Sequence, residues 1–113
     1  MLLVKTITVP ELKEMSKKMY EPIVKAVVDI ETREVVVDAE FHSDQELFLL
    51  DRGSNQENLW GINLWPSKYG TDEFVEFDSM INIRPRQNNR SRGVENSEIR
   101  KIIVKIVSEV VKQ

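Results

Sequence analysis

Apolar residues recur along the chain with two periods, which together divide it into eight short elements. Two β-branched runs, 24–31 and 34–41, alternate apolar and polar residues on either side of a polar turn at 32–33, which predicts a β-hairpin. The same period of two predicts three further strands, in segments 2–7, 58–65 and 76–84. The alternation is most regular in segment 76–84, so we expect a strand there with one buried face.

Three helices are predicted between and after these strands. The first covers about 9–19, because the segment TVPE at 8–11 combines a capping box with a proline in the first turn. A second capping box, SDQE at 43–46, opens a short helix that runs to about Asp51 and is closed by Gly53. The third helix begins after Asn96, and its aliphatic residues have the spacing of an amphipathic helix: Ile99, Ile102, Ile103, Ile106, Val107 and Val110.

The resulting order, βαββαββα, predicts an α+β fold with a mostly antiparallel sheet and helices on one face. With 113 residues, the chain has the usual length of a single domain, so we expect one domain over residues 1–113. If the helices cover one face of the sheet, the other face is either solvated or used for binding.

Composition narrows the classes of function. The chain has no cysteine and one histidine, His42, which excludes disulfides, cysteine-ligated zinc and multi-histidine metal sites. The net charge of -3 means that any anion must be bound by a local basic patch. No apolar run approaches the ~18 residues of a membrane span, and no segment resembles a signal peptide. We therefore expect a cytoplasmic protein with no membrane partner.

The loop after the last predicted strand is rich in arginine, with four between positions 84 and 92 and no acid before Glu95. Guanidinium groups bind phosphate and carboxylate bidentately, and Asn88 tolerates the left-handed backbone that forms an anion-binding nest of amides. The first hypothesis is therefore a binding module for a small anionic ligand, which needs no cofactor. The residues expected to hold or orient the ligand are Arg84, Arg90, Asn89, Asn82, Asn63 and Ser91.

Two considerations limit this hypothesis. The arginines could instead pair with nearby acids and only pin the loop: Glu76, Asp78, Glu95 and Glu98. The net acidity, and the lack of aromatic residues within the loop, argue against nucleic acid as the partner.

The alternative hypothesis is a small metal-assisted hydrolase of the phosphoester type. Asp38 with Glu40, and Glu76 with Asp78, are spaced i, i+2 on predicted strands, so each pair points one way with about 6.5–7 Å between its members. If the strands were neighbours, the four carboxylates could hold Mg²⁺, with His42 and Glu76 in catalytic roles. The simpler interpretation is a solvated strand face.

A third hypothesis is a protein-interaction module. Aromatic residues gather in and around one predicted strand: Trp60, Trp65, Tyr69 and Phe74. Aromatic residues and arginine are enriched at interface hot spots, and segment 2–7 could be an exposed edge strand that pairs with a second copy. The partner would then be another protein or, through this edge strand, a second copy of the chain in a homodimer. The tryptophans could equally fill the core.

Two segments, 53–66 (GSNQENLWGINLWP) and 76–91 (EFDSMINIRPRQNNRS), resemble a family of short bacterial and archaeal proteins known as a domain of unknown function, number 5674. The likeness spans nearly the whole chain, and INIRP…NRS is its most specific part. A glycine precedes Asn-Arg-Ser in that family, whereas this chain has Asn88. The resemblance implies a stand-alone cytoplasmic α+β domain and carries no activity, cofactor or catalytic residue.

Overall fold

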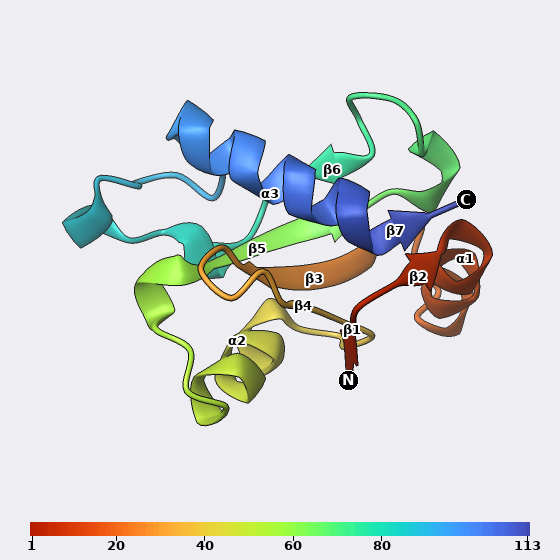
Figure 1. Ribbon diagram of the computed structural model, residues 1–113, viewed down its shortest axis with the longest axis horizontal. Helices are drawn as coiled ribbons and strands as arrows, with labels where there is room; N and C mark the ends of the chain where they lie inside the picture. The colour runs from red at the N-terminus through yellow and green to blue at the C-terminus, as the bar shows by residue number, and fades with distance from the viewer.

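A five-stranded antiparallel sheet runs through the molecule in the order β1-β4-β3-β5-β6 (Figure 1). The computed structural model describes residues 1–113. The strands are β1 (Leu2–Val4), β3 (Val24–Asp29), β4 (Val35–Val37), β5 (Leu59–Leu64) and β6 (Val75–Glu76). β3 pairs with β5 over its full length, from Val24 opposite Leu64 to Asp29 opposite Leu59. The predicted central hairpin and the α+β class are confirmed.

A second, two-stranded sheet joins the two ends of the chain. β2 (Ile7–Thr8) runs parallel to β7 (Val111–Lys112). The prediction of one strand over 2–7 is therefore wrong. Val4 and Ile7 both pack in the same core although they are three residues apart, which a continuous strand with period two cannot achieve. The chain turns between them and leaves the larger sheet.

The helices are α1 (Val9–Lys18), α2 (His42–Asp51) and α3 (Ser97–Val110). The capping box of α1 forms as predicted: the Thr8 hydroxyl accepts from the Glu11 N–H at 3.3 Å, and the Glu11 carboxylate accepts from the Thr8 N–H at 3.0 Å. The Asn96 side chain also caps α3. The second capping box does not form. α2 begins two residues earlier than predicted, with Phe41 rather than Ser43 at the N-cap, and no side chain caps it.

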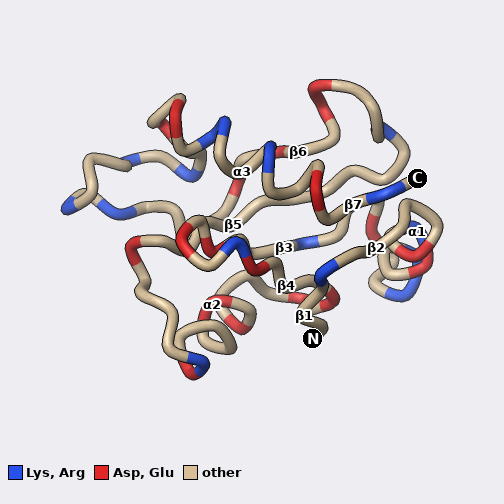
Figure 2. Tube along the Cα trace, in the orientation of Figure 1, with Lys and Arg blue, Asp and Glu red and all other residues tan.

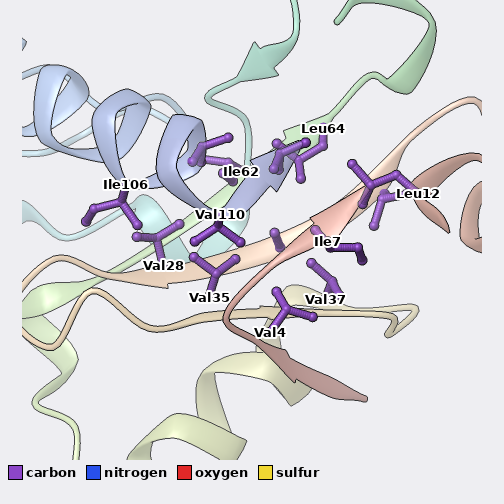
Figure 3. Close-up of a cluster of buried hydrophobic side chains, with 14 of the residues drawn as sticks. Val4, Ile7, Leu12, Val28, Val35, Val37, Ile62, Leu64, Ile106 and Val110 are labelled. Carbon is purple, nitrogen blue, oxygen red and sulfur yellow. The ribbon is translucent and has the colours of Figure 1, made fainter. Parts of the chain in front are cut away.

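The main core of 20 buried residues lies between one face of the sheet and the helices α1 and α3. Ile106 and Val110 of α3 point towards the strands, and Leu12 of α1 joins the same cluster (Figure 3). The buried stripe of α3 is narrower than predicted and consists of Ile103, Ile106, Val107 and Val110. Ile102, expected to point inward, is 38% exposed.

The other face of the sheet is also covered, so the expectation of helices on one face is wrong. Val27 and Val36 form a second cluster with Leu49 of α2. Figure 1 shows α3 on one side of the sheet and α2 on the other. The apolar residues on the two faces of β3 and β4 therefore belong to two cores. Little of the face that packs against α2 is left for solvent.

Of the predicted strand 76–84, only Glu76 lies in β6, and Met80–Asn82 forms a 3₁₀ turn; a second 3₁₀ turn, Pro85–Gln87, follows the segment. Phe77 and Ile81 have the same parity, so a strand would place them on one face. Instead, Phe77 packs against the main core and Ile81 against the second one. The segment therefore crosses the edge of the sheet, which a regular strand cannot do.

An asparagine side chain takes the place of the missing strand. The Asn82 amide donates to the Gly61 carbonyl and its oxygen accepts from the Gly61 N–H, both at 2.9 Å, as a neighbouring strand would. A Cβ on Gly61 would lie 2.6 Å from the Ser79 side chain, so only glycine admits this approach. The buried positions here are thus the polar Ser79 and Asn82.

Candidate functional site

The loop between the Met80–Asn82 turn and α3, residues 84–93, is held together by buried amides. The Asn89 amide nitrogen donates to the carbonyl oxygens of Asn82 at 2.7 Å and Gly93 at 2.8 Å. Its oxygen accepts from the Glu95 N–H at 2.8 Å. Asn88 has the left-handed backbone that its residue type predicts, with φ of 59°. The polar side-chain atoms of Asn82 and Asn89 are therefore all hydrogen-bonded within the protein.

Arg84, the first of the predicted ligand-binding arginines, is directed into the protein. Its guanidinium nitrogens donate to the carbonyl oxygens of Gln56, at 2.5 Å, and Leu59. The guanidinium also lies over the Trp60 ring at 4.1 Å from its centre. Burial lowers the pKa of Arg84 from its ordinary value. This arginine fastens the loop to the start of β5.

The loop does build a small anion-binding nest, but its occupant is part of the chain. The backbone N–H groups of Arg90 and Ser91 donate to one carboxylate oxygen of Glu95, at 2.7 and 2.9 Å. These two hydrogen bonds are the main reason that the pKa of Glu95 is lowered. The Arg90 side chain extends into solvent, and Figure 2 shows that lysine and arginine positions gather on this loop.

The four carboxylates of the predicted magnesium site lie in two separate places. Asp38 and Glu40 follow β4, whereas Glu76 and Asp78 lie in and after β6, and β3 and β5 run between these strands. Asp38 lies 3.8 Å from the Lys18 ammonium group. No group of three or more histidine and carboxylate side chains is arranged to hold a metal ion. The structure does not bring this set of residues together.

The aromatic residues are divided between core and surface. Trp60 is buried in the main core, as the simpler interpretation expected. Trp65 is only partly buried and donates from Nε1 to the Glu76 carboxylate at 3.3 Å. Tyr69 packs edge-on against Phe74, with ring centres 5.1 Å apart. The homodimer hypothesis stays a prediction, with β1 at one edge of the sheet.

Three predicted residues meet in a hollow of about 380 Å³ between the start of α2 and the segment after β6. They are His42, Asn63 and Asp78. The hollow, which we call the His42 hollow, also contains two cations that the sequence did not single out as site residues, Lys25 and Arg92. Only the fold could reveal them, because they come from β3 and from the far end of the arginine loop.

His42 is held in one tautomer. Its Nε2 lies 2.7 Å from the Ile62 carbonyl oxygen, which can only accept, so Nε2 carries the hydrogen and Nδ1 of the neutral ring is a bare acceptor. Burial is the main cause that lowers the pKa of His42; Lys25 and Arg92 add to the effect, while the Ile62 carbonyl and Asp78 oppose it. The ring is therefore neutral near pH 7, and Nδ1 makes no hydrogen bond within the protein.

The two cations of the hollow are oriented by hydrogen bonds. The Arg92 carbonyl accepts from the Ser79 N–H and from the Asn82 amide, both at 2.9 Å. Its side-chain Nε donates to the Asp78 carboxylate at 2.6 Å, which leaves both Nη groups for another acceptor. The Lys25 ammonium group donates to the Glu40 carbonyl at 2.8 Å and retains two further hydrogens.

The N-terminus of α2 faces the same hollow without a cap. Phe41 occupies the N-cap position with the extended backbone that capping residues adopt, φ -128° and ψ 135°, but it has no polar side chain. Phe41, His42 and Ser43 all line the hollow. The partial positive charge at this helix end therefore adds to the charges of Lys25 and Arg92.

Asn63 contributes a buried polar group to the hollow. It is 5% exposed, and its amide nitrogen donates to the Glu76 carboxylate at 2.8 Å. Because both neighbours of this nitrogen are acceptors, the amide orientation is fixed, and Oδ1 is left without a partner. The other predicted ligand-binding residues, which do not line the hollow, are Arg84, Arg90, Asn89, Asn82 and Ser91.

Residues 1–110 match the model of a family described as a protein of unknown function, DUF5674. The chain belongs to this family. The residues that carried its resemblance to DUF5674 include Gly61, Asn82 and Asn89, and in the structure these hold the loop against β5. No curated protein and no solved structure matches the chain. None of its helices has the length and apolar character needed to cross a membrane.

Proposed function

We propose that this DUF5674 protein is a binding module for a small anion, and that the ligand occupies the His42 hollow. The observation that carries the proposal is the convergence of Lys25, Arg92 and the uncapped start of α2 on one hollow. Positively charged donors and a helix N-terminus together are the usual means by which proteins bind phosphate and carboxylate groups. Asp78 offsets one charge, so the hollow keeps a net positive character.

The size and rigidity of the hollow support a small ligand. Its volume of about 380 Å³ falls at the lower end of the range for ligand pockets, roughly 300–1,000 Å³. The Arg92 backbone is fixed by two hydrogen bonds, and its side chain is oriented by Asp78. Binding therefore requires little ordering of the protein, and each charge-assisted hydrogen bond can contribute about 1.5–3 kcal/mol.

This proposal keeps the anionic ligand expected from the sequence but moves its site. The guanidinium of Arg84 and the amides of Asn82 and Asn89 are already hydrogen-bonded within the chain, and Glu95 occupies the nest at Arg90. Of the six residues predicted to bind the anion, only Asn63 lines the hollow. Arg92 takes the role that was predicted for Arg84 and Arg90.

A calorimetric titration with phosphate, sulfate and small carboxylates, supported by thermal shifts, tests the proposal. Arg92→Gln should weaken binding by about tenfold or more, because it removes a charge-assisted contact. Arg86→Gln is the matched control: Arg86 is an exposed arginine of the same loop that does not line the hollow. No binding to the wild-type protein, or equal loss in both variants, would refute the site.

A further inference from the structure

We infer that the ligand of the His42 hollow carries a hydroxyl or amino group beside its anionic group, and that His42 Nδ1 accepts the hydrogen bond from it. A 2-hydroxy carboxylate or glycerol phosphate has this chemistry, whereas a simple carboxylate or alkyl phosphate lacks it. The inference rests on the proposed function and specifies which anions the hollow prefers.

The hollow contains acceptors as well as donors. Lys25, Arg92 and the start of α2 supply donors, which a plain anion would satisfy. His42 Nδ1 and the second carboxylate oxygen of Asp78 are acceptors with no partner in the protein. An anion with no hydrogen to donate would occupy the hollow and leave these acceptors shielded from water and unpaired, which weakens binding.

The acceptor role of Nδ1 follows from geometry. The Ile62 carbonyl oxygen lies 2.7 Å from Nε2 and keeps the ring hydrogen on that nitrogen. The other nitrogen of the neutral ring, Nδ1, can therefore only accept. Asn63, which also lines the hollow, is 5% exposed and has an Oδ1 without a partner in the protein. Nδ1 of His42 therefore calls for a donor on the ligand, which a bare anion does not supply.

A site that hydrogen-bonds a hydroxyl rejects the analogue that lacks it, because its own buried groups are then left unpaired. The hollow is wide enough for an anionic group near Arg92 and a donor near His42 within one small molecule. We therefore expect the site to discriminate between matched ligands that differ by a single hydroxyl.

The test is calorimetry on the full chain with two matched pairs, lactate against propionate and glycerol 3-phosphate against propyl phosphate. In each pair the hydroxylated ligand should bind about tenfold more tightly or better. The variant His42→Gln places an amide nitrogen near the position of Nε2, which keeps a donor for Ile62, and removes Nδ1. It should lose most of the preference for lactate over propionate, and the ratio of the two affinities is the readout.

A measurement on the wild-type protein covers the case in which His42→Gln does not fold. Protonation turns Nδ1 from an acceptor into a donor, so the preference for lactate should shrink as the pH falls below the pKa of His42. The charged groups facing this ring are Lys25 from β3, Asp78 after β6 and Arg92 from the loop. The preference should therefore persist at neutral pH and shrink only at acid pH, below the lowered pKa of His42.

Each outcome separates the two claims. If none of the four ligands binds, the proposed function is wrong. If both members of each pair bind equally, the anion site stands and the inference about the donor is refuted. If the preference persists in His42→Gln and at acid pH, another acceptor is responsible, and the role given to Nδ1 is wrong.

Discussion

The arginine loop and the His42 hollow are both lined by cations and polar side chains, yet they differ in what those groups bind. In the loop, the Asn89 amide, the Arg84 guanidinium and the nest at Arg90 are all bonded to the chain itself. In the hollow, the Nη groups of Arg92 and Nδ1 of His42 have no partner in the protein.

This difference separates groups that stabilise a fold from groups that are available to a ligand. The loop replaces a strand with side-chain amides, so its polar residues are needed for the structure. The hollow is built on rigid supports from α2, β3 and the loop, and its charged ends are left free. Changes in the loop should therefore lower stability, and changes in the hollow should alter binding or pH dependence.

The largest effect is expected from Asn82→Ala. This change leaves the buried N–H and carbonyl oxygen of Gly61 without their partner, and it removes one of the two hydrogen bonds to the Arg92 carbonyl. We expect a loss of about 3 kcal/mol in the free energy of unfolding, measured with urea. Asn55→Ala is the control, because Asn55 is exposed and its side chain makes no capping bond; its effect should stay within ~0.5 kcal/mol. Equal effects would contradict the structural role of Asn82.

The next effect is expected from Gly61→Ala, at about 2 kcal/mol in the same measurement. The added methyl would lie 2.6 Å from the Ser79 side chain and push the segment after β6 off the sheet edge. Ser79→Gly removes the clash, so the double variant should lose less stability than the sum of the single ones. Strict additivity would show that Gly61 and Ser79 do not meet.

These two positions also show why this part of the fold could not be read from the sequence. Period and caps were enough for α1, α3 and the central hairpin, because local rules decide them. Segment 76–84 has a strand pattern, but its course depends on one amide, Asn82, bonding to a glycine about 20 residues away, which no local pattern reveals.

The residues of the candidate site were only partly predicted from the sequence. An anion site near the arginines was predicted, and His42, Asn63 and Asp78 were each singled out for different reasons. Lys25 and Arg92 were missed because β3 and the loop meet only in the folded chain. The occupant of the nest, Glu95, could have been suspected, since it is the first acid after four arginines.

A smaller, two-sided effect is expected from Phe41→Ser. Serine at this N-cap can accept from the first N–H groups of α2, which stabilises a helix by up to about 1 kcal/mol. The same bond would occupy donors that face the hollow. We expect an unfolding midpoint that does not fall, together with phosphate affinity that is weaker by severalfold. Unchanged affinity would show that the helix terminus takes no part in binding.

The smallest effect is a change in stability with pH, confined to the range between the folded and unfolded pKa values of His42. Burial lowers the pKa of His42 below 6.5, so in that window the unfolded chain binds a proton that the folded chain does not. Stability from this source is complete above pH 6.5 and falls as the pH drops towards the folded pKa. Urea unfolding at several pH values should show this decline in the wild type, and His42→Gln should lack it. An identical decline in both would exclude His42 as its source.

The parallel pairing of Ile7 with Val111 has a consequence for how the protein folds. Closing a loop of roughly a hundred residues costs about 4 kcal/mol of chain entropy, so this contact is an unfavourable place to begin. The hairpin of β3 and β4 needs only a short turn and can form first. During synthesis, β2 has no strand neighbour until β7 has left the ribosome, so the domain cannot close before that point.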